Sequence, residues 1–242
     1  MDRIDYMFAW HAAALEKVGT VDVADGVREA AVGTYDIKIT GKGGHGGFPH
    51  KANNPVIPAA ELVSAINLIP ALKCDPLENC TVSVSYFQCG VDGVANVIPE
   101  RVSMGGNARV LNTDLRDFVM KEIERLAKAI CAAHQCQCDI SLVYGYPANT
   151  IDATCNDIFR KAAASMGLTV LDNPPVLGAE DFAYYAQKKP AGIAKLGMAD
   201  PTGAIAPTSH HNPCFYIDDE KGLPLALEYM LTVYETALQE LM

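Results

Sequence analysis

The sequence predicts an α/β protein that carries a small α+β domain as an insertion, and three observations lead to this fold class. Residues 34–146 show the order strand, helix, strand, strand, helix, strand. The flanking segments, residues 1–33 and 147–242, instead alternate between strand and helix patterns. Such alternation is typical of an α/β sheet covered by helices on both faces. We therefore predict that the two flanking segments form one α/β domain, into which residues 34–146 are inserted.

The inserted domain opens with a strand and a helix. In TYDIKIT, residues 34–40, apolar and polar residues alternate, as expected of a strand with one buried face. NNPVIPAAELVSAINLI follows, where Asn54 is a candidate N-cap and Pro55 a candidate first helical residue. TVSVSYF, residues 81–87, alternates again and predicts the second strand.

The second half of this domain repeats the pattern. After the turn-forming CGVDG, the segment RVSMGGNARV at residues 101–110 predicts a strand. A long helix is predicted from about Thr113 to Ala133, because apolar residues recur there at steps of three and four. CDISLVY, residues 138–144, predicts the last strand. The order β-α-β-β-α-β is the ferredoxin-like arrangement, whose uncovered face and edge are available for pairing.

The flanking segments supply the elements of the α/β domain. DYMFAW predicts a short strand that ends at His11, and GTVDVA predicts a second strand. The C-terminal segment predicts, in order, a helix, a strand, a helix, a strand and an amphipathic helix, at residues 152–166, 168–172, 180–189, 192–199 and 224–242.

Composition and charge exclude several classes of protein. The formal net charge of −10 argues against a sequence-independent nucleic-acid binder, which needs a basic surface. No apolar run approaches the roughly 18–20 residues that cross a bilayer. The N-terminus reads poorly as a signal peptide, and eight cysteines without an export signal favour reduced thiols in the cytoplasm.

One cysteine cluster has two interpretations. His134, Cys136 and Cys138 lie together in AHQCQCDI, which would suit a metal or redox site. No second cluster is present to complete the usual four ligands of a structural zinc site. We therefore prefer structural cysteines.

Histidines near predicted strand and helix ends are the first candidates for chemistry. Ligands in open α/β sheets gather beyond the carboxyl ends of strands, so His11 is placed as a metal ligand would be, although a packed or surface histidine is the alternative. His211 opens HNPCFYIDD, between a loop and the C-terminal helix. The neighbouring Asn and Pro imply a fixed turn that suits a ligand, but an ordinary loop histidine explains it equally well. His210 has no assigned role.

The segment GKGGHGGFPH is the most function-like local sequence. Four glycines surround His45, and glycine allows backbone conformations that are closed to other residues and a close approach of the imidazole to a partner. The segment does not match a phosphate-binding loop. Arg109, near a strand end, would suit bidentate recognition of a carboxylate or would be a surface arginine. Asn96 in VANVIPE is a turn residue by default.

Taken together, these segments carry a resemblance to a known family. They occur in the order WHAAALEKVGTVDVADG, YDIKITGKGGHGGFPHKANNP, ANVIPERVSMGGNARV, YGYPANT, GAEDFAYYAQKKP and HNPCFYIDDE. This series resembles the metal-dependent N-acyl-amino-acid amidohydrolases, which include hippurate hydrolases, aminoacylases, auxin-conjugate amidohydrolases and carboxypeptidase G-like enzymes. The resemblance covers almost the whole chain. It is closest to the hippurate hydrolase and auxin-conjugate branch, because of GGHG followed by PH and because of GAEDF.

The resemblance implies a fold and a set of cofactors. It implies an α/β catalytic domain that binds two divalent metals, zinc or manganese, and an inserted ferredoxin-like lid domain that pairs two subunits in a homodimer. His11 and His211 match metal ligands. His45 matches the lid histidine that reaches the neighbouring subunit's active site and steadies the oxyanion.

The resemblance also implies substrate-binding residues. Asn96 and Arg109 match residues that hold the substrate near its carboxylate. Glu180 and Asp181 match a motif near the active site, with a structural or substrate-positioning role. His50 matches a recurrent position without a firm role.

The family pattern is incomplete in this sequence. In members of the family, the remaining metal ligands and the general-base Glu lie in an earlier segment, which has no counterpart in these 242 residues. We expect this chain to be the C-terminal part of an amidohydrolase that hydrolyses the amide bond of N-acyl or N-aroyl amino acids, and to be inactive alone. Two alternatives stay open. The chain could be a non-catalytic dimerising module that binds a carboxylate, or one half of a split enzyme completed by a separate N-terminal polypeptide.

Overall fold

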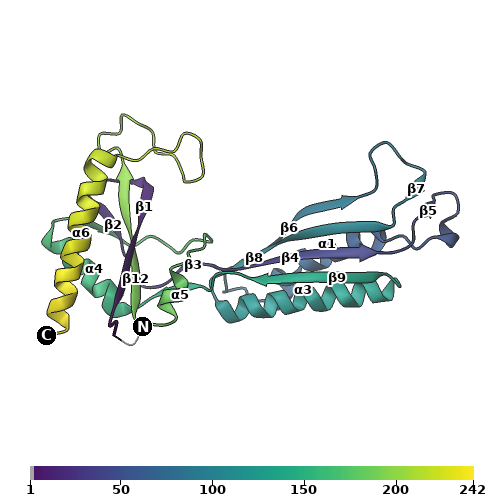
Figure 1. The fold of residues 1–242 in the computed structure, drawn as a ribbon, viewed down its shortest axis with the longest axis horizontal. Helices are drawn as coiled ribbons and strands as arrows, with labels where there is room; N and C mark the ends of the chain where they lie inside the picture. The colour runs from purple at the N-terminus through teal and green to yellow at the C-terminus, as the bar shows by residue number, and fades with distance from the viewer. Residues whose placement is uncertain (1–2) are drawn as a thin grey trace. The chain divides into compact units, whose positions relative to one another are not determined.

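A computed structural model describes residues 3–242, and the chain divides into two compact units. Unit 1 comprises the residues up to Glu29 together with Asn149–Val176 and Glu180–Met242. Unit 2 comprises Ala30–Ala148 and Leu177–Ala179. The elements of both units are labelled in Figure 1.

Unit 1 is built on a mixed sheet of four strands in the order β1-β12-β2-β11. Parallel pairing joins β1 to β12 and β2 to β11, while β12 and β2 are antiparallel. A separate antiparallel pair joins β3 and β10. The strands are β1 (Met7–Lys17), β2 (Thr20–Asp22), β3 (Gly26–Glu29), β10 (Asn149–Ile151), β11 (Thr169–Leu171) and β12 (Ala191–Ala199).

Both long helices of unit 1, α4 (Ala153–Ser165) and α6 (Asp219–Glu240), pack on the same face of this sheet (Figure 1). Phe159 of α4 stacks on Tyr229 of α6 with ring centroids 6.1 Å apart, and the Tyr229 hydroxyl donates to the carbonyl oxygen of Phe159 at 3.0 Å. Alternate strand residues on this face, Phe8 and Trp10 among them, pack against that core.

The prediction that helices cover both faces of this sheet holds only in part for the described residues, because only the short α5 lies on the second face. The other face packs Met7, Ala9 and Ile193 against a small cluster that includes Phe182, beside α5 (Ala183–Ala186). The physical reason is that α4 and α6 both turn their apolar stripes to one core, and no second long helix of residues 3–242 is left for the opposite face.

Two helices of unit 1 differ from their predicted bounds. Helix α6 begins at Asp219 rather than at 224. The Asp218 carboxylate accepts from the N–H of Lys221 and caps the helix at this earlier position. Pro224 therefore lies inside the helix. Helix α5 is one short turn rather than a helix over residues 180–189, since the Glu180 carboxylate accepts from the N–H of Phe182 and forms a turn before it.

Unit 2 contains an antiparallel sheet of four strands in the order β6-β8-β4-β9. Each predicted strand of residues 34–146 is present, with β6 and β9 at the edges. The strands are β4 (Ala31–Thr40), β6 (Cys80–Cys89), β8 (Arg101–Val110) and β9 (Gln137–Tyr144). Two short strands, β5 (Gly44–His45) and β7 (Val97–Ile98), pair with each other at one end of the unit (Figure 1).

The helices of unit 2 cover one face of its sheet. Both predicted helices are confirmed as α1 (Val56–Asn67) and α3 (Thr113–Ala133), while α2 (Ile69–Lys73) and the 3₁₀ turn η1 (Pro49–Lys51) were not predicted. Helix α1 begins one residue later than predicted, since Pro55 and not Asn54 is its N-cap and Val56 is its first residue. The Asn54 carboxamide accepts from the N–H of Val56 at 3.0 Å, which makes a turn just before the helix.

Ridges of α1 and α3 fill the core of unit 2. Among its fully buried residues are Tyr35 and Ile37 of β4, Leu62 of α1, Met104 of β8 and Ile123 of α3. No helix of residues 3–242 is long and apolar enough to cross a membrane.

Candidate functional site

His11 lies inside a strand rather than at its end, so this part of the prediction is wrong. Its backbone pairs with Lys195 of β12, and the parallel pairing continues past it to Ala13 before the register shifts. The exposed imidazole contacts the carbonyl oxygen of Ala12 through Nδ1 at 2.8 Å. Because a carbonyl oxygen only accepts, Nδ1 carries the proton and Nε2 keeps its lone pair. A histidine held in this tautomer is prepared to bind a metal through Nε2.

The histidine that meets His11 is His210, which the sequence left without a role. The two rings lie 5.2 Å apart between centroids and are nearly perpendicular, at 84°. Phe215 packs on the other side of His210 at 5.2 Å. The predicted ligand His211 is exposed, and its backbone takes a φ of 61°, in the left-handed region that non-glycine residues rarely adopt. A backbone outlier of this kind is a reason to suspect function at His211.

The loop that carries both histidines is anchored at its two ends. At its start, the Asp200 carboxylate accepts from the N–H groups of Thr202 and Ile205 and from the Thr202 hydroxyl. These hydrogen bonds lower the pKa of Asp200 to about 2. At its end, the N–H of Asp218 donates to the carbonyl oxygen of Met198 at 2.8 Å. The loop is therefore fixed to the end of β12 and the start of α6.

Acidic and basic groups influence one another beside His11. Burial raises the pKa of Glu180, as does a hydrogen bond with Asp181, while the N–H of Phe182 and the charge of His11 act in the opposite direction. Burial and the neighbouring His11 lower the pKa of His210, which favours its neutral form. His11 thus interacts with both Glu180 and His210 within unit 1, although the three residues come from separate segments of the chain.

A buried polar network lies beside His11 and was missed by sequence reasoning. Lys195, the strand neighbour of His11, places Nζ 2.6 Å from Oε1 of the buried Glu29. Asn149 donates from Nδ2 to Oε2 of Glu29 at 2.8 Å, so both carboxylate oxygens have partners. Lys195 lies in a predicted strand, but Glu29 lies in β3, which was not predicted, so only the tertiary fold shows that the two residues pair.

The described residues do not make a complete metal site. Within residues 3–242, no group of three or more histidine, cysteine, aspartate and glutamate side chains is placed so that it could hold a metal ion. Catalytic zinc sites use three protein ligands, so His11 and the loop histidines do not by themselves make such a site in the described part of the chain.

The cysteine cluster also does not form a metal site. Cys136 is buried and Cys138 packs against the core of unit 2. His134 instead directs Nε2 to the carboxylate of Glu61 on α1, at 2.9 Å.

His45 lies at the end of unit 2 formed by β5 and β7, where it pairs with Val97. Its exposed ring accepts at Nδ1 a hydrogen bond of 3.0 Å from the N–H of Gly47. In the neutral imidazole, the proton therefore lies on Nε2, which is the donor. The N–H of Gly46 donates to the carbonyl oxygen of Asn96 at 2.8 Å and joins the His45 segment to the Asn96 turn.

The glycines around His45 do not act as expected. None of them has a positive φ, so the prediction that they adopt conformations closed to other residues is wrong. They are needed for close packing. A Cβ on Gly43 would lie 2.9 Å from the carbonyl oxygen of Ile98, and one on Gly44 would lie 3.2 Å from the Ala52 side chain. His50 lies in η1 of the same segment, 6.3 Å from Phe48 between ring centroids.

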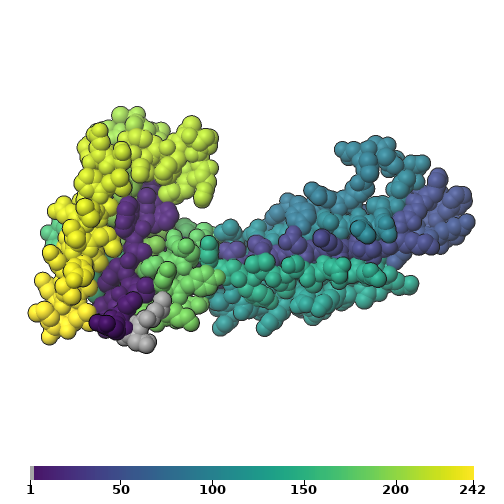
Figure 2. All heavy atoms as spheres, viewed as in Figure 1, coloured from purple at the N-terminus to yellow at the C-terminus, as the bar shows by residue number. Residues whose placement is uncertain are grey.

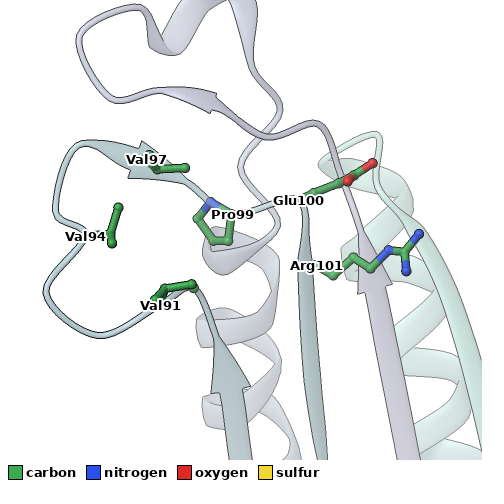
Figure 3. A pocket seen from close by; sticks show the side chains of 7 residues that line it. Val91, Val94, Val97, Pro99, Glu100 and Arg101 are labelled. Atoms are coloured by element: carbon green, nitrogen blue, oxygen red, sulfur yellow. The ribbon is translucent and has the colours of Figure 1, made fainter.

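An apolar hollow adjoins Asn96. The loop after β6 borders an open hollow of about 460 Å³, whose lining includes Val91, Val94 and Val97 together with Glu100 and Arg101 (Figure 3). In the space-filling view, this loop projects from unit 2 beside the segment around His45 (Figure 2). His45 and Asn96 thus share one end of unit 2 with an apolar surface.

Arg109 lies at the other end of the same unit. It is the last residue but one of β8, and its Nη1 donates to the carbonyl oxygen of Leu177 at 2.7 Å. Eight residue steps separate it from Arg101, which is about 27 Å along an antiparallel strand. One copy of unit 2 therefore does not bring His45 and Asn96 to the same small substrate as Arg109.

Comparison with known proteins relates the chain to a family of hydrolases. Residues 29–135 match the peptidase dimerisation domain of the M20 type. Over 228 residues, the chain is 33% identical to the amidohydrolase-like protein YhaA of Bacillus subtilis, covering 93% of this chain and 57% of YhaA. The chain is a homologue of the M20 amidohydrolases and peptidases.

Two further M20 homologues bear on the fold and on the length. The N-acetylcysteine deacetylase of Bacillus subtilis is 28% identical over 229 residues, which are 95% of this chain and 58% of the deacetylase. The Bacillus subtilis YxeP structure, described as a dinuclear metal-binding M20 peptidase, superposes with a TM-score of 0.77 at 24% identity, over 99% of this chain and 58% of YxeP. The chain thus spans somewhat more than half of the length of these relatives.

Proposed function

We propose that this chain is part of a metal-dependent amidohydrolase that hydrolyses the amide bond of N-acyl or N-aroyl amino acids. The observation that carries the proposal is the separation, within unit 2, of an exposed Nε2–H donor at His45 from the guanidinium of Arg109. Two copies would be needed to place both groups on one small substrate. The match of residues 29–135 to a dimerisation domain supports a homodimer.

His45 is suited to steady an oxyanion in the partner subunit. As the amide carbonyl is attacked, negative charge develops on its oxygen, and a preorganised N–H donor stabilises that charge. The hydrogen bond from Gly47 fixes the imidazole with its proton on Nε2. The exposed position of the ring leaves this N–H available to a partner.

Asn96 and Arg109 are suited to bind the amino acid part of the substrate. A guanidinium binds a carboxylate through two parallel hydrogen bonds, and a carboxamide adds a further donor. Glu180 lies beside His11, where it would position the substrate.

The metal ligands that this chain would contribute are His11 and His211, for two zinc or manganese ions in a complete site. The contact of His11 Nδ1 with the Ala12 carbonyl supports this assignment, because it leaves Nε2 free to coordinate. The remaining ligands and the general base are not among residues 3–242 in this proposal, so we expect the chain alone to be inactive.

The division into domains follows from the same proposal. Residues 34–146 would be the ferredoxin-like lid and dimerisation domain, inserted into a catalytic α/β domain formed by residues 1–33 and 147–242. The order β6-β8-β4-β9 and the unit boundaries near Ala30 and Ala148 support this division. The eight cysteines, all of them free, support a cytoplasmic location.

A chimera tests the activity. This chain would replace the matching 228-residue region of YhaA, and N-acetyl and N-benzoyl amino acids would be assayed with manganese or zinc. We expect hydrolysis by the chimera and none by the 242-residue chain alone. Hydrolysis by the isolated chain would contradict the proposal that its site is incomplete.

Mixing two inactive variants tests the action across subunits. His45→Ala and His211→Ala chimeras should each have strongly reduced activity, while a mixed dimer should regain activity because it contains one site with both histidines. Giving the two variants different affinity tags and purifying over both tags in succession would verify that mixed dimers form. Mixed dimers without any recovered activity would contradict the assignment of His45 to the partner's site.

A further inference from the structure

Two cysteines of unit 2 flank a short exposed turn. Cys74 follows α2 directly, and Cys80 is the first residue of the edge strand β6. Their Sγ atoms lie 3.6 Å apart, and both side chains are half-buried at the rim of the core. The five residues between them, Asp75 to Asn79, are all exposed.

Hydrogen bonds hold the turn in the form that brings the two sulfurs together. The Asp75 carboxylate accepts from the N–H of Leu77 at 2.9 Å, and the Asp75 carbonyl accepts from the N–H of Glu78 at 2.9 Å. Cys80 is paired with Val110 of β8. The approach of the sulfurs is thus a property of the folded turn and strand, and not of two freely moving side chains.

The other cysteines do not combine these features. Cys131, Cys136 and Cys155 are buried in the cores of their units, where an oxidant has little access. Cys89 and Cys214 are exposed, and the half-buried Cys138 packs against the core with the buried Cys131 as its hydrogen-bond partner. Among the described sulfur pairs, the one formed by Cys74 and Cys80 combines a close approach with a position beside an exposed turn.

We propose that Cys74 and Cys80 are a reversible dithiol–disulfide pair that exchanges with low-molecular-weight disulfides such as oxidised glutathione. The sulfurs would move from 3.6 Å to the bonded distance of about 2.05 Å, a shift that a side-chain rotation can supply. The bond would tie the end of α2 to the start of the edge strand β6.

The exchange proceeds in two balanced steps. The Cys74 thiolate attacks one sulfur of the oxidised glutathione, the S–S bond breaks, and one glutathione thiolate leaves. The Cys80 sulfur then attacks Cys74 in the mixed disulfide, loses its proton to the solvent and expels the second glutathione. The two cysteines lose two electrons, which the glutathione disulfide gains. Burial raises the pKa of Cys80 to about 12, which makes it the slower nucleophile and so the second to react.

Peptide mapping tests the proposal on the folded 242-residue chain. A glutamate-specific protease cuts after Glu61, Glu78 and Glu100, so that Cys74 and Cys80 fall in different peptides, residues 62–78 and 79–100. A Cys89→Ser background is used because Cys89 lies in the second peptide. After incubation with oxidised glutathione, free thiols are alkylated under denaturing conditions before digestion.

We expect peptides 62–78 and 79–100 to be joined under non-reducing conditions and separated by dithiothreitol. Cys74→Ser and Cys80→Ser variants should each lose the linkage, with circular dichroism verifying that they fold. The oxidised protein should also melt at a higher temperature than the reduced protein, and this difference should vanish in both variants. Two alkylated thiols at these positions after oxidation, or a stable mixed disulfide of Cys74 with glutathione, would overturn the proposal.

Discussion

Gly47 donates its backbone N–H to Nδ1 of His45 at 3.0 Å, two residues away. This contact assigns the tautomer of an exposed histidine, since Nδ1 must be an acceptor. We therefore predict that His45 in the folded chain carries its proton on Nε2 at neutral pH. Long-range ¹H–¹⁵N spectra, with a His45→Gln variant to identify its signals, would measure this. A majority of the Nδ1–H tautomer would contradict the assignment.

The same hydrogen bond leads to a kinetic expectation. In the active chimera, His45→Ala should lower kcat by about 10²–10³-fold, because an oxyanion donor acts in the transition state. KM should change little, since the substrate carboxylate is bound elsewhere. A higher KM with an unchanged kcat would show that His45 contributes to binding of the substrate and not to stabilising the transition state.

A buried ion pair makes unit 1 sensitive to a single substitution. Nη2 of Arg28 lies 2.8 Å from the Asp22 carboxylate, and their side chains are only 6% and 4% exposed. Arg28→Ala should lower the free energy of unfolding by about 3–5 kcal/mol, because it leaves a buried carboxylate without its partner. Urea unfolding would measure the change.

Arg160→Ala is the matched control for this ion pair. Arg160 pairs with Asp25, whose side chain is 64% exposed. An exposed pair contributes at most about 1 kcal/mol, so the variant should be nearly as stable as the parent. An equal decrease in the free energy of unfolding in the two variants would show that burial does not determine how much the Arg28–Asp22 pair stabilises the fold.

Arg116 of α3 holds the ends of two strands in unit 2. Its Nη1 donates to the carbonyl oxygens of Val32, Gly145 and Tyr146 at 3.0–3.3 Å. Arg116→Lys should lower the free energy of unfolding by about 1–3 kcal/mol, because an ammonium group cannot reproduce the geometry of these bonds. Arg125→Lys, on the exposed side of the same helix, should leave stability unchanged. Denaturant unfolding of both variants would decide whether Arg116 has this role.

Elements defined by a local pattern could be predicted from the sequence, whereas sites that depend on pairing across the chain could not. Helix α3 begins and ends at the predicted Thr113 and Ala133, because its apolar stripe continues along the helix. The short pair β3 and β10 escaped prediction, since each is too short to show alternation.

In the candidate site, too, local patterns could be predicted from the sequence, whereas contacts between distant residues could not. The His45 segment stood out through its local glycines, yet the reason for two of them lies in Ile98 and Ala52, which come later in the chain. The ring contact of His11 with His210 joins positions about two hundred residues apart in sequence, and no local pattern distinguishes His210 from His211.

The carboxylate of Asp200 makes the loop that carries His210 and His211 sensitive to acid. Hydrogen bonds from Thr202 and Ile205 lower its pKa from 3.8 to about 2 in the folded state. A carboxyl group whose pKa is lower in the folded than in the unfolded chain stabilises the fold at pH values above its unfolded-state pKa. This contribution of Asp200 is therefore fully present above pH 3.8 and is lost as the pH falls towards 2. Asp200→Asn removes the titrating group but keeps one oxygen acceptor. Its deficit in stability relative to the parent should therefore be largest at neutral pH and should shrink below pH 3.8, as measured by urea unfolding at a series of pH values. A deficit that stays constant over this range would show that the charge of Asp200 does not stabilise the loop.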